Sequence, residues 1–183
     1  MSVQESASAV ATVPRVVCRI ARDAVDLAAY HELRRRIFCE EQGLFTVDDG
    51  DAWDAVATPI VCVLDETSSE RVIGVVRIYE ATPGVWYGGR LGVDASSRRM
   101  GNIGRLLILK AVSTAHAWGC REFLAVVQPQ NVPLFRRLHW RVVRPVEAHG
   151  IEHAMMRADL AHYPPNSDAD VGCRPKALNH DAA

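Results

Sequence analysis

The sequence predicts one α+β domain built on a mixed, mostly antiparallel sheet with flanking helices. A chain of 183 residues, 49% hydrophobic and 23% charged, is long enough for one sizeable core and too short for two ordinary domains. Most of the periodic segments alternate as strands and follow one another closely, which predicts hairpins. One long helical segment separates two apolar strands, and a helical crossover of this kind predicts a parallel pair within the sheet.

The first half of the chain supplies a strand, a helix and a hairpin. Residues 1–14 are rich in Ser and Ala and are expected to be disordered. Residues 15–20 alternate as a strand, and apolar positions recur at helical spacing over 23–38 after an Asp that is expected to cap the helix. β-Branched segments at 59–64 and 71–80 flank a polar turn and are expected to pair. The opposite face of the helix is expected to be solvated and carries Arg34, Arg35 and Arg36.

The second half centres on a strand, a helix and a second strand. An apolar segment at 85–94 is followed by a helix over 101–119 and by a buried strand at 123–128. The two strands are expected to pair in parallel around Leu91 and Ala125. A short helix and two further strands are expected at 134–138, 140–147 and 152–160.

Composition bounds the domain and its partners. The polar residues 161–183 are expected to form a flexible tail, which leaves 15–160 as the domain. The formal net charge of −1 gives no overall field that favours nucleic acid or an acidic membrane. With neither a bilayer-spanning segment nor a signal peptide visible, a cytoplasmic location is expected. The cysteines lack a Cys-x-x-Cys pair and are expected to be reduced core residues, not a disulfide framework or a zinc site, at Cys18, Cys39, Cys62, Cys120 and Cys173.

The turn between the 85–94 strand and the following helix predicts an anion site. Glycines at 88, 89 and 92 indicate a bulge in the strand or a place where a ligand approaches its backbone. Arg98 and Arg99 then precede a helix start that contains Gly101 and Gly104, so backbone N–H groups and the helix dipole face outward beside two guanidinium groups. A P-loop needs Lys-Ser/Thr after its last glycine, and a dinucleotide fingerprint needs Gly-x-Gly-x-x-Gly; neither is present. An ordinary glycine-containing loop is the remaining alternative.

Leu91–Val93 followed by this turn resembles the acyl-coenzyme A signature of the GNAT superfamily of N-acetyltransferases, a strand ending in Leu-x-Val before Arg-x-x-Gly-x-Gly/Ala. The register is open, because the motif fits from Arg98 with Gly101 or from Arg99 with Gly104. The resemblance implies a GNAT fold with splayed central parallel strands. It also implies a coenzyme A site formed by Leu91, Gly92, Val93, Arg98, Arg99, Met100, Gly101, Asn102, Ile103, Gly104, Arg105, Asn131 and Phe135.

The resemblance covers roughly residues 15–160. Segments 36–43, 83–93 and 135–140 are similar to the nitrogen-starvation N-acetyltransferase family, which implies a role in bacterial nitrogen metabolism. The implied activity is transfer of an acetyl group from acetyl-CoA to a small amine, with no metal. A homodimer is a possible assembly.

Two departures from the superfamily pattern bear on mechanism. Phe135 stands where many relatives have a tyrosine that protonates the leaving thiolate, and Tyr87 and Gly88 stand where many have a glutamate. The segment 150–156 is similar to a Gly-x-x-His-x-x-Met pattern of relatives, which makes His153 the candidate base, with a buried structural histidine as the alternative. The spacing of the nearby histidines offers too few ligands for a metal.

An acidic loop is the candidate acceptor side. Carboxylates cluster between residues 40 and 54, and a similar segment of relatives, acyl-homoserine-lactone synthases included, lines the acceptor side. Glu41, Asp51 and Asp54 are therefore expected to hold a cationic acceptor. A solvated acidic loop is the alternative.

Three other functions remain open from the sequence. A lactone-synthase-like enzyme would use an acyl carrier protein and S-adenosylmethionine. A non-enzymatic acyl-CoA sensor is favoured by the absent Tyr and Glu, and an interaction protein would use the fold alone.

Overall fold

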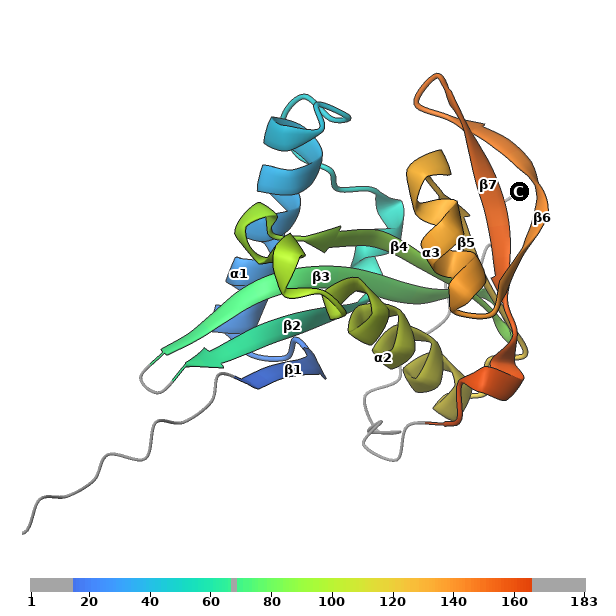
Figure 1. Ribbon diagram of the computed structural model, residues 1–183, viewed down its shortest axis with the longest axis horizontal. Coiled ribbons are helices and arrows are strands. Elements are labelled where there is room, and N and C mark those ends of the chain that lie inside the picture. The colour runs from blue at the N-terminus through green and yellow to red at the C-terminus, as the bar shows by residue number, and fades with distance from the viewer. Residues whose placement is uncertain (1–14, 67–68, 166–183) are drawn as a thin grey trace, which may run out of the picture.

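The computed structural model describes residues 15–66 and 69–165, so the expectations for 1–14 and 166–183 lie outside the described residues. Seven strands form one sheet in the order β1-β2-β3-β4-β5-β7-β6 (Figure 1). The strands are β1 (Arg15–Ile20), β2 (Thr58–Glu66), β3 (Ser69–Thr82), β4 (Val85–Val93), β5 (Glu122–Val127), β6 (Trp140–Ala148) and β7 (Ile151–Ala158). The α-helices are α1 (Ala24–Arg35), α2 (Ile103–Ala117) and α3 (Val132–Arg137).

The predicted mixed sheet is confirmed, with one parallel pair at its centre. All neighbouring strands pair antiparallel except β4 and β5, whose registered residues run from Val85 with Glu122 to Gly88 with Ala125. The parallel pairing expected for the strands around Leu91 and Ala125 is confirmed; it ends at Gly88, beyond which the two strands part (Figure 1). The β3–β4 register shifts between Val75 and Arg77, and such a bulge bends the strand.

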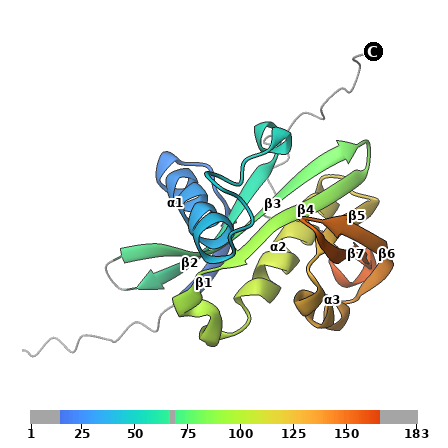
Figure 2. The same cartoon turned by 90° about the horizontal axis from the view of Figure 1, so that it is seen from above.

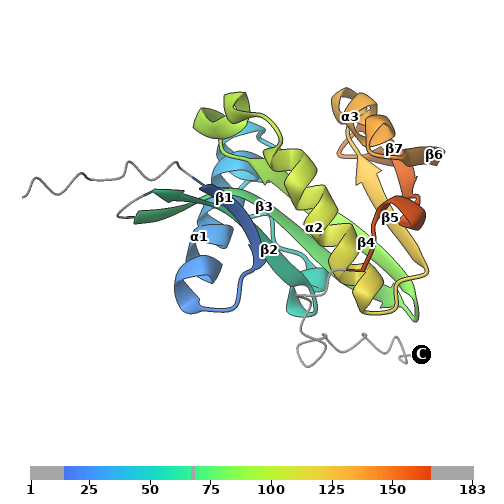
Figure 3. The same cartoon turned by 60° about the horizontal axis from the view of Figure 1, so that its bottom comes forward.

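The helices cover both faces of the sheet. Figures 2 and 3 show α1 on one face of the β2–β4 region and α2 on the other. The α1 side buries Tyr30, Leu33 and Ile37 against β2 and β3, whereas α2 buries Leu107 and its neighbours in the larger core. Both faces of these strands therefore pack into apolar cores.

The start of α1 follows a local signal in the sequence. The side chain of Asp23 accepts a hydrogen bond from the N–H of Asp26 at 2.8 Å, which confirms the predicted cap. The helix continues as a π-helical turn over Arg36–Glu41. π-Turns are frequent at functional sites, and this one carries the chain from α1 into the acidic loop.

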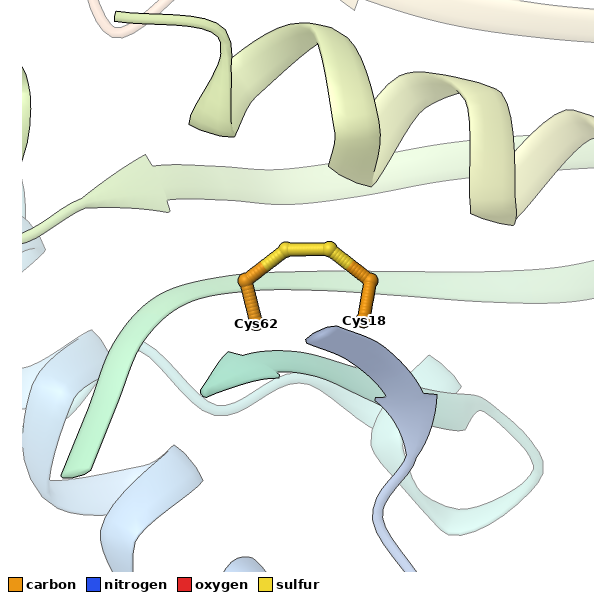
Figure 4. Close-up of a disulfide and its surroundings, with 2 residues drawn as sticks. All are labelled: Cys18 and Cys62. Carbon is orange, nitrogen blue, oxygen red and sulfur yellow. A yellow bond between two sulfur atoms is a disulfide. The ribbon is translucent and has the colours of Figure 1, made fainter. Parts of the chain in front are cut away.

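Two of the cysteines contradict the expectation of reduced thiols. Cys18 on β1 and Cys62 on β2 are directly opposite in the antiparallel register, with Cα atoms 4.0 Å apart, and a disulfide joins them (Figure 4). They are 44 residues apart in the sequence, so only the strand pairing brings them together. Cys39 and Cys120 are free thiols, and burial raises the pKa of Cys120 to about 12.

The folded domain extends past residue 160. Tyr163 is buried; its hydroxyl donates to the carbonyl of Leu138 and accepts from Nε1 of Trp140 at 2.9 Å. The carbonyl of Tyr163 also lies 2.6 Å from Nδ1 of His116 on α2. Tyr163, which precedes a Pro-Pro pair, thus packs into the core three residues beyond the expected boundary at 160.

Candidate active site

The turn between β4 and α2 presents backbone N–H groups at the N-terminus of a 15-residue helix. Gly101 and Asn102 have positive φ angles of 67° and 62°, and α2 begins at Ile103. The N–H of Ile103 donates to the carbonyl of Gly101 at 2.8 Å, whereas the N–H groups of Gly104 and Arg105 in the first turn have no carbonyl partner within the helix. A Cβ added to Gly101 would meet nothing within 4 Å, and one added to Gly104 would approach only Leu134, at 3.9 Å. The open approach and the helix dipole therefore fit a pyrophosphate.

A groove of about 610 Å³ runs from this turn to the separated ends of β4 and β5. Leu91, Gly92 and Val93 form one wall, and the loop and helix after β5, including Asn131, form the other. Because β4 pairs with β5 only up to Gly88, the β5-facing edge of this wall is open to an extended ligand. The geometry fits the pantetheine arm that the sequence resemblance implied.

The other residues predicted to bind coenzyme A lie in different parts of the structure, some in the groove, some on the surface and some in the core. Arg98 lines the groove, whereas Arg99 and Met100 are exposed and do not line it. Ile103 is buried with α2 in the core. Phe135 is also buried, with its ring edge-on to that of Trp140 at 4.9 Å between centroids. Phe135 is therefore absent from the groove and lines the cavity described below.

Glu41 lies on the coenzyme A side of the molecule. Its Oε1 is 2.5 Å from Nη2 of Arg98, whose Nε donates to the carbonyl of Val93 at 3.1 Å. Glu41 also lines the groove, while Asp51 lines the cavity described below. The structure does not bring together the three carboxylates expected to bind one acceptor.

A cavity of about 400 Å³ passes through the sheet where β4 and β5 separate. On the α1 face it is lined by Trp53, Tyr79 and Tyr87, and on the α2 face by Ile108 and Ala111 among others. The groove and the cavity share part of their lining, so they open into each other. The shared residues are Leu44, Leu91, Gln128, Asn131 and His153.

His153 is buried at this junction, with 7% of its surface exposed. Its Nδ1 lies 2.9 Å from the carbonyl oxygen of Ile151. Because a carbonyl oxygen only accepts, Nδ1 must carry the proton of the hydrogen bond. The other nitrogen, Nε2, is then the acceptor in the neutral ring, as a general base requires.

Arginines already hold the predicted acceptor carboxylates. Asp51 accepts from Nη1 of Arg77 at 2.8 Å, and Asp54 accepts from Nη1 of Arg34 at 2.6 Å. Burial acts to raise the pKa of Asp54, but hydrogen bonds from Arg34 and Arg77 outweigh it and keep the pKa below its usual range. At Asp51 burial also acts to raise the pKa, but the hydrogen bond and the positive charge of Arg77 outweigh it, so the pKa is lowered. These side chains are therefore counter-ions within the fold.

Arg34 is buried, whereas the sequence predicted that it would face solvent. Its side chain is 1% exposed, and its Nε donates to Asp49 at 2.8 Å. Nη1 also donates to the hydroxyl of Tyr30 at 3.0 Å. Tyr30, Leu33, Arg34 and Ile37 share one helix face, so an arginine within the apolar stripe was the available signal.

The glycines of β4 serve packing. A Cβ at Gly92 would come within 2.8 Å of Ile37, and one at Gly88 within 3.0 Å of Phe123. Both positions therefore need glycine for packing, and they also border the site, since Gly92 lines the groove and Gly88 lines the cavity. At Gly89 the nearest atom would be Nε of Arg77, at 3.6 Å.

The family model of the acetyltransferase (GNAT) family matches residues 27–140, more than half of the chain. The chain therefore belongs to the acetyltransferase (GNAT) family, an acyltransferase family that uses acyl-CoA as co-substrate. No curated protein matches the sequence.

Solved structures share the fold at low sequence identity. The chain is similar to an acyl-CoA N-acyltransferase from Pseudomonas aeruginosa (TM-score 0.63, 18% identity, 79% of this chain and 99% of that one). It is similar to Escherichia coli ElaA (TM-score 0.65, 19% identity, 80% and 100%). A third is the CoA-dependent acyl-homoserine lactone synthase BjaI, with S-adenosylmethionine and isopentyl-CoA (TM-score 0.63, 18% identity, 82% and 86%).

Residues 15–66 and 69–165 contain no group of three His, Cys, Asp or Glu side chains that could hold a metal ion. Nor do they contain a helix long and apolar enough to cross a membrane.

Proposed function

We propose that the protein transfers an acyl group, acetyl in the simplest case, from acyl-CoA to the nitrogen of a small amine. The observation that carries this proposal is the junction of groove and cavity at Leu91, Gln128 and His153. Coenzyme A bound along the groove, with its pyrophosphate at the Arg98–Arg105 turn, would have its thioester at this junction. An amine entering from the α1 face would meet the thioester there, and holding both reactants in place supplies much of the catalysis.

The chemistry follows from this arrangement. The amine nitrogen attacks the thioester carbonyl carbon, a C–N bond forms, and the C–S bond breaks as coenzyme A leaves as a thiolate. The nitrogen loses one proton, for which Nε2 of His153, directly or through a water, is the acceptor. An N–H group of the unpaired part of β4 is in a position to donate to the oxyanion. A thiolate is a good leaving group, so Phe135 in place of a tyrosine does not prevent the reaction.

The finer identity of the reaction rests on the sequence resemblance. Similarity to the nitrogen-starvation N-acetyltransferases supports a small-amine acceptor and a role in bacterial nitrogen metabolism. A cytoplasmic location and a homodimer also stay predictions.

A longer acyl group is a second candidate, and one observation favours it. The inner end of the cavity lies between the sheet and α2 and is lined by Ile108, Ala111 and Val112. Each methylene buried there would contribute about 0.8 kcal/mol. Ala111→Phe would fill this end and shift the preferred acyl-CoA toward acetyl, whereas Ala28→Phe on the exposed side of α1 is the matched control. An unchanged chain-length profile in Ala111→Phe would leave acetyl as the simpler assignment.

The proposal is tested by a mass-spectrometric screen of amines with acetyl-CoA, read together with release of the coenzyme A thiol. N-acylated product and thiol should appear in equal amounts for at least one amine. Acetyl-CoA that binds but releases no thiol above the rate without protein would instead make the chain an acyl-CoA sensor. Stabilisation by S-adenosylmethionine and not by acetyl-CoA would favour the lactone-synthase alternative.

A further inference from the structure

We propose that the acceptor is an amino acid with a flat, apolar side chain, and that the guanidinium of Arg90 binds its carboxylate. This inference rests on the proposed acyl transfer and names the class of amine. It also replaces the cationic acceptor expected from the acidic loop. Arginines bind the carboxylates of that loop that were expected to hold it, and the group that remains available to a ligand is a guanidinium nitrogen of Arg90.

Arg90 is held in a conformation that aims its side chain into the cavity. Its φ angle is 55°, in the left-handed region that few residues other than glycine adopt. The β3–β4 register shift lies beside it, and bulges of this kind often re-aim a side chain next to an active site. Arg90 lines the cavity, and Leu91, the next residue, lines its junction with the groove.

The hydrogen bonds of Arg90 leave one nitrogen for a ligand. Nε and Nη2 both donate to the carbonyl of Asp49, at 3.1 and 2.6 Å, and Nη2 lies 3.3 Å from Oδ2 of Asp51. No hydrogen bond from Nη1 to a described residue is present, so two N–H groups of a side chain only 17% exposed remain. Nη1 and its neighbours form the planar edge that binds carboxylates well.

Arg90 shares both of its carboxylate partners with other arginines. Asp49 is also bound by Arg34 and Asp51 by Arg77, within a cluster of three arginines and three aspartates whose formal charges balance. Burial first, and then repulsion from Arg77, lower the pKa of Arg90 despite the attraction of these carboxylates. An acceptor with a second ammonium group would meet this repulsion, whereas a carboxylate would relieve it.

The opposite wall suits a flat apolar group. The Trp53 and Tyr79 rings stack at 4.4 Å between centroids and 18° between planes. Tyr79 and Tyr87 continue the stack at 5.8 Å and 11°. All three line the cavity, and Phe45 lies beneath the Arg90 guanidinium at 4.6 Å. An amino acid with its carboxylate at Arg90 and its side chain on this wall would direct its nitrogen to the junction.

The test compares two ligands that differ only in the carboxylate. N-acetyl-L-phenylalanine and N-acetyl-2-phenylethylamine are titrated by calorimetry into the wild-type protein saturated with coenzyme A. We expect the carboxylate ligand to bind about tenfold more tightly, the effect of one charge-assisted hydrogen bond. Arg90→Gln should remove the difference by weakening only that ligand, and Arg90→Lys should restore part of it. Arg141→Gln, on the exposed side of β6, is the control that keeps the difference.

Equal affinity of the two ligands for wild-type protein overturns the proposal even if Arg90→Gln fails to fold. An equal loss for both ligands in a folded Arg90→Gln variant overturns it as well. Thiol release separates this inference from the proposed function. Equal release with L-phenylalanine and 2-phenylethylamine overturns the inference while acyl transfer stands. Selective binding of N-acetyl-L-phenylalanine with no release for any amine supports recognition by Arg90 and overturns acyl transfer.

Discussion

The proposed coenzyme A side and the proposed acceptor side of the site are built in different ways. The first is a contiguous turn, Arg98–Arg105, whose backbone N–H groups would provide the binding charge. The second is assembled from α1, β3, β4 and the acidic loop, where arginine and aspartate side chains neutralise one another. N–H groups at a helix start keep their polarity whatever lies elsewhere in the chain, but a carboxylate loses its availability once a distant arginine binds it. A sequence therefore predicts an anion site made of backbone N–H groups better than a binding site made of charged side chains.

The largest expected effect tests the backbone side of this comparison. Gly104→Glu would place a side chain and a negative charge against the first turn of α2, which is open at present. Acetyl-CoA affinity should fall about a thousandfold, because two charge-assisted hydrogen bonds contribute roughly 1.5–3 kcal/mol each. Calorimetry measures the change. Leu109→Glu, which adds the same charge to the exposed side of α2, should bind normally; unchanged affinity in folded Gly104→Glu would move the pyrophosphate elsewhere.

The next effect tests whether Asp54 is a counter-ion of the fold. Asp54→Asn should lower the free energy of unfolding at pH 7 by about 3 kcal/mol, since it leaves Arg34 and Arg77 under-compensated. The folded pKa of Asp54 is depressed, so its contribution is present above the ordinary carboxyl pKa and is lost as pH falls through the folded value.

Urea unfolding followed by circular dichroism between pH 7 and pH 2 measures this contribution. The difference between wild type and Asp54→Asn should narrow as the pH falls below about 4. The exposed Asp65→Asn variant should stay close to wild type throughout. A difference that does not change with pH would show that the Asp54 carboxylate adds no charge-dependent stability.

The third prediction concerns the junction between the two sides. His153→Ala should lower kcat by about a hundredfold and leave acetyl-CoA affinity unchanged, because the imidazole accepts the amine proton and does not hold coenzyme A. The acid limb of the pH–rate profile should flatten. His31→Ala, at an exposed position of α1, is the control. A near-normal kcat in His153→Ala would make this histidine structural.

The smallest expected effect tests whether Glu41 influences acetyl-CoA binding or acceptor binding. Glu41→Gln removes the partner of Arg98, so the guanidinium would be freer to bind phosphate and acetyl-CoA affinity should rise a few-fold. The Michaelis constant for the acceptor should not change, since Glu41 does not line the acceptor cavity. A raised Michaelis constant for the acceptor, with unchanged acetyl-CoA affinity, would instead show that Glu41 contributes to acceptor binding.

The sequence by itself determined the features that depend on neighbouring residues. Asp23 caps α1 because cap and N–H groups are three residues apart, and the hairpin of β2 and β3 follows from alternation on both sides of a polar turn. The anion-binding turn is likewise a local matter of glycine spacing and a helix start. These signals, with the acyl-CoA signature, were sufficient for the GNAT fold and family.

Only the tertiary structure decided which side chains meet. Cys18 reaches Cys62 through strand register, and Arg34 becomes buried because Asp49 and Asp54 fold back over α1. The glycines of β4 indicate a bulge, but the residue at which β4 and β5 separate, Gly88, appears only in the paired sheet. In each case the partners are far apart in the chain. Their pairing is set by how the sheet and α1 pack. A carboxylate that the sequence predicts to bind a ligand therefore forms an ion pair with an arginine of the fold instead.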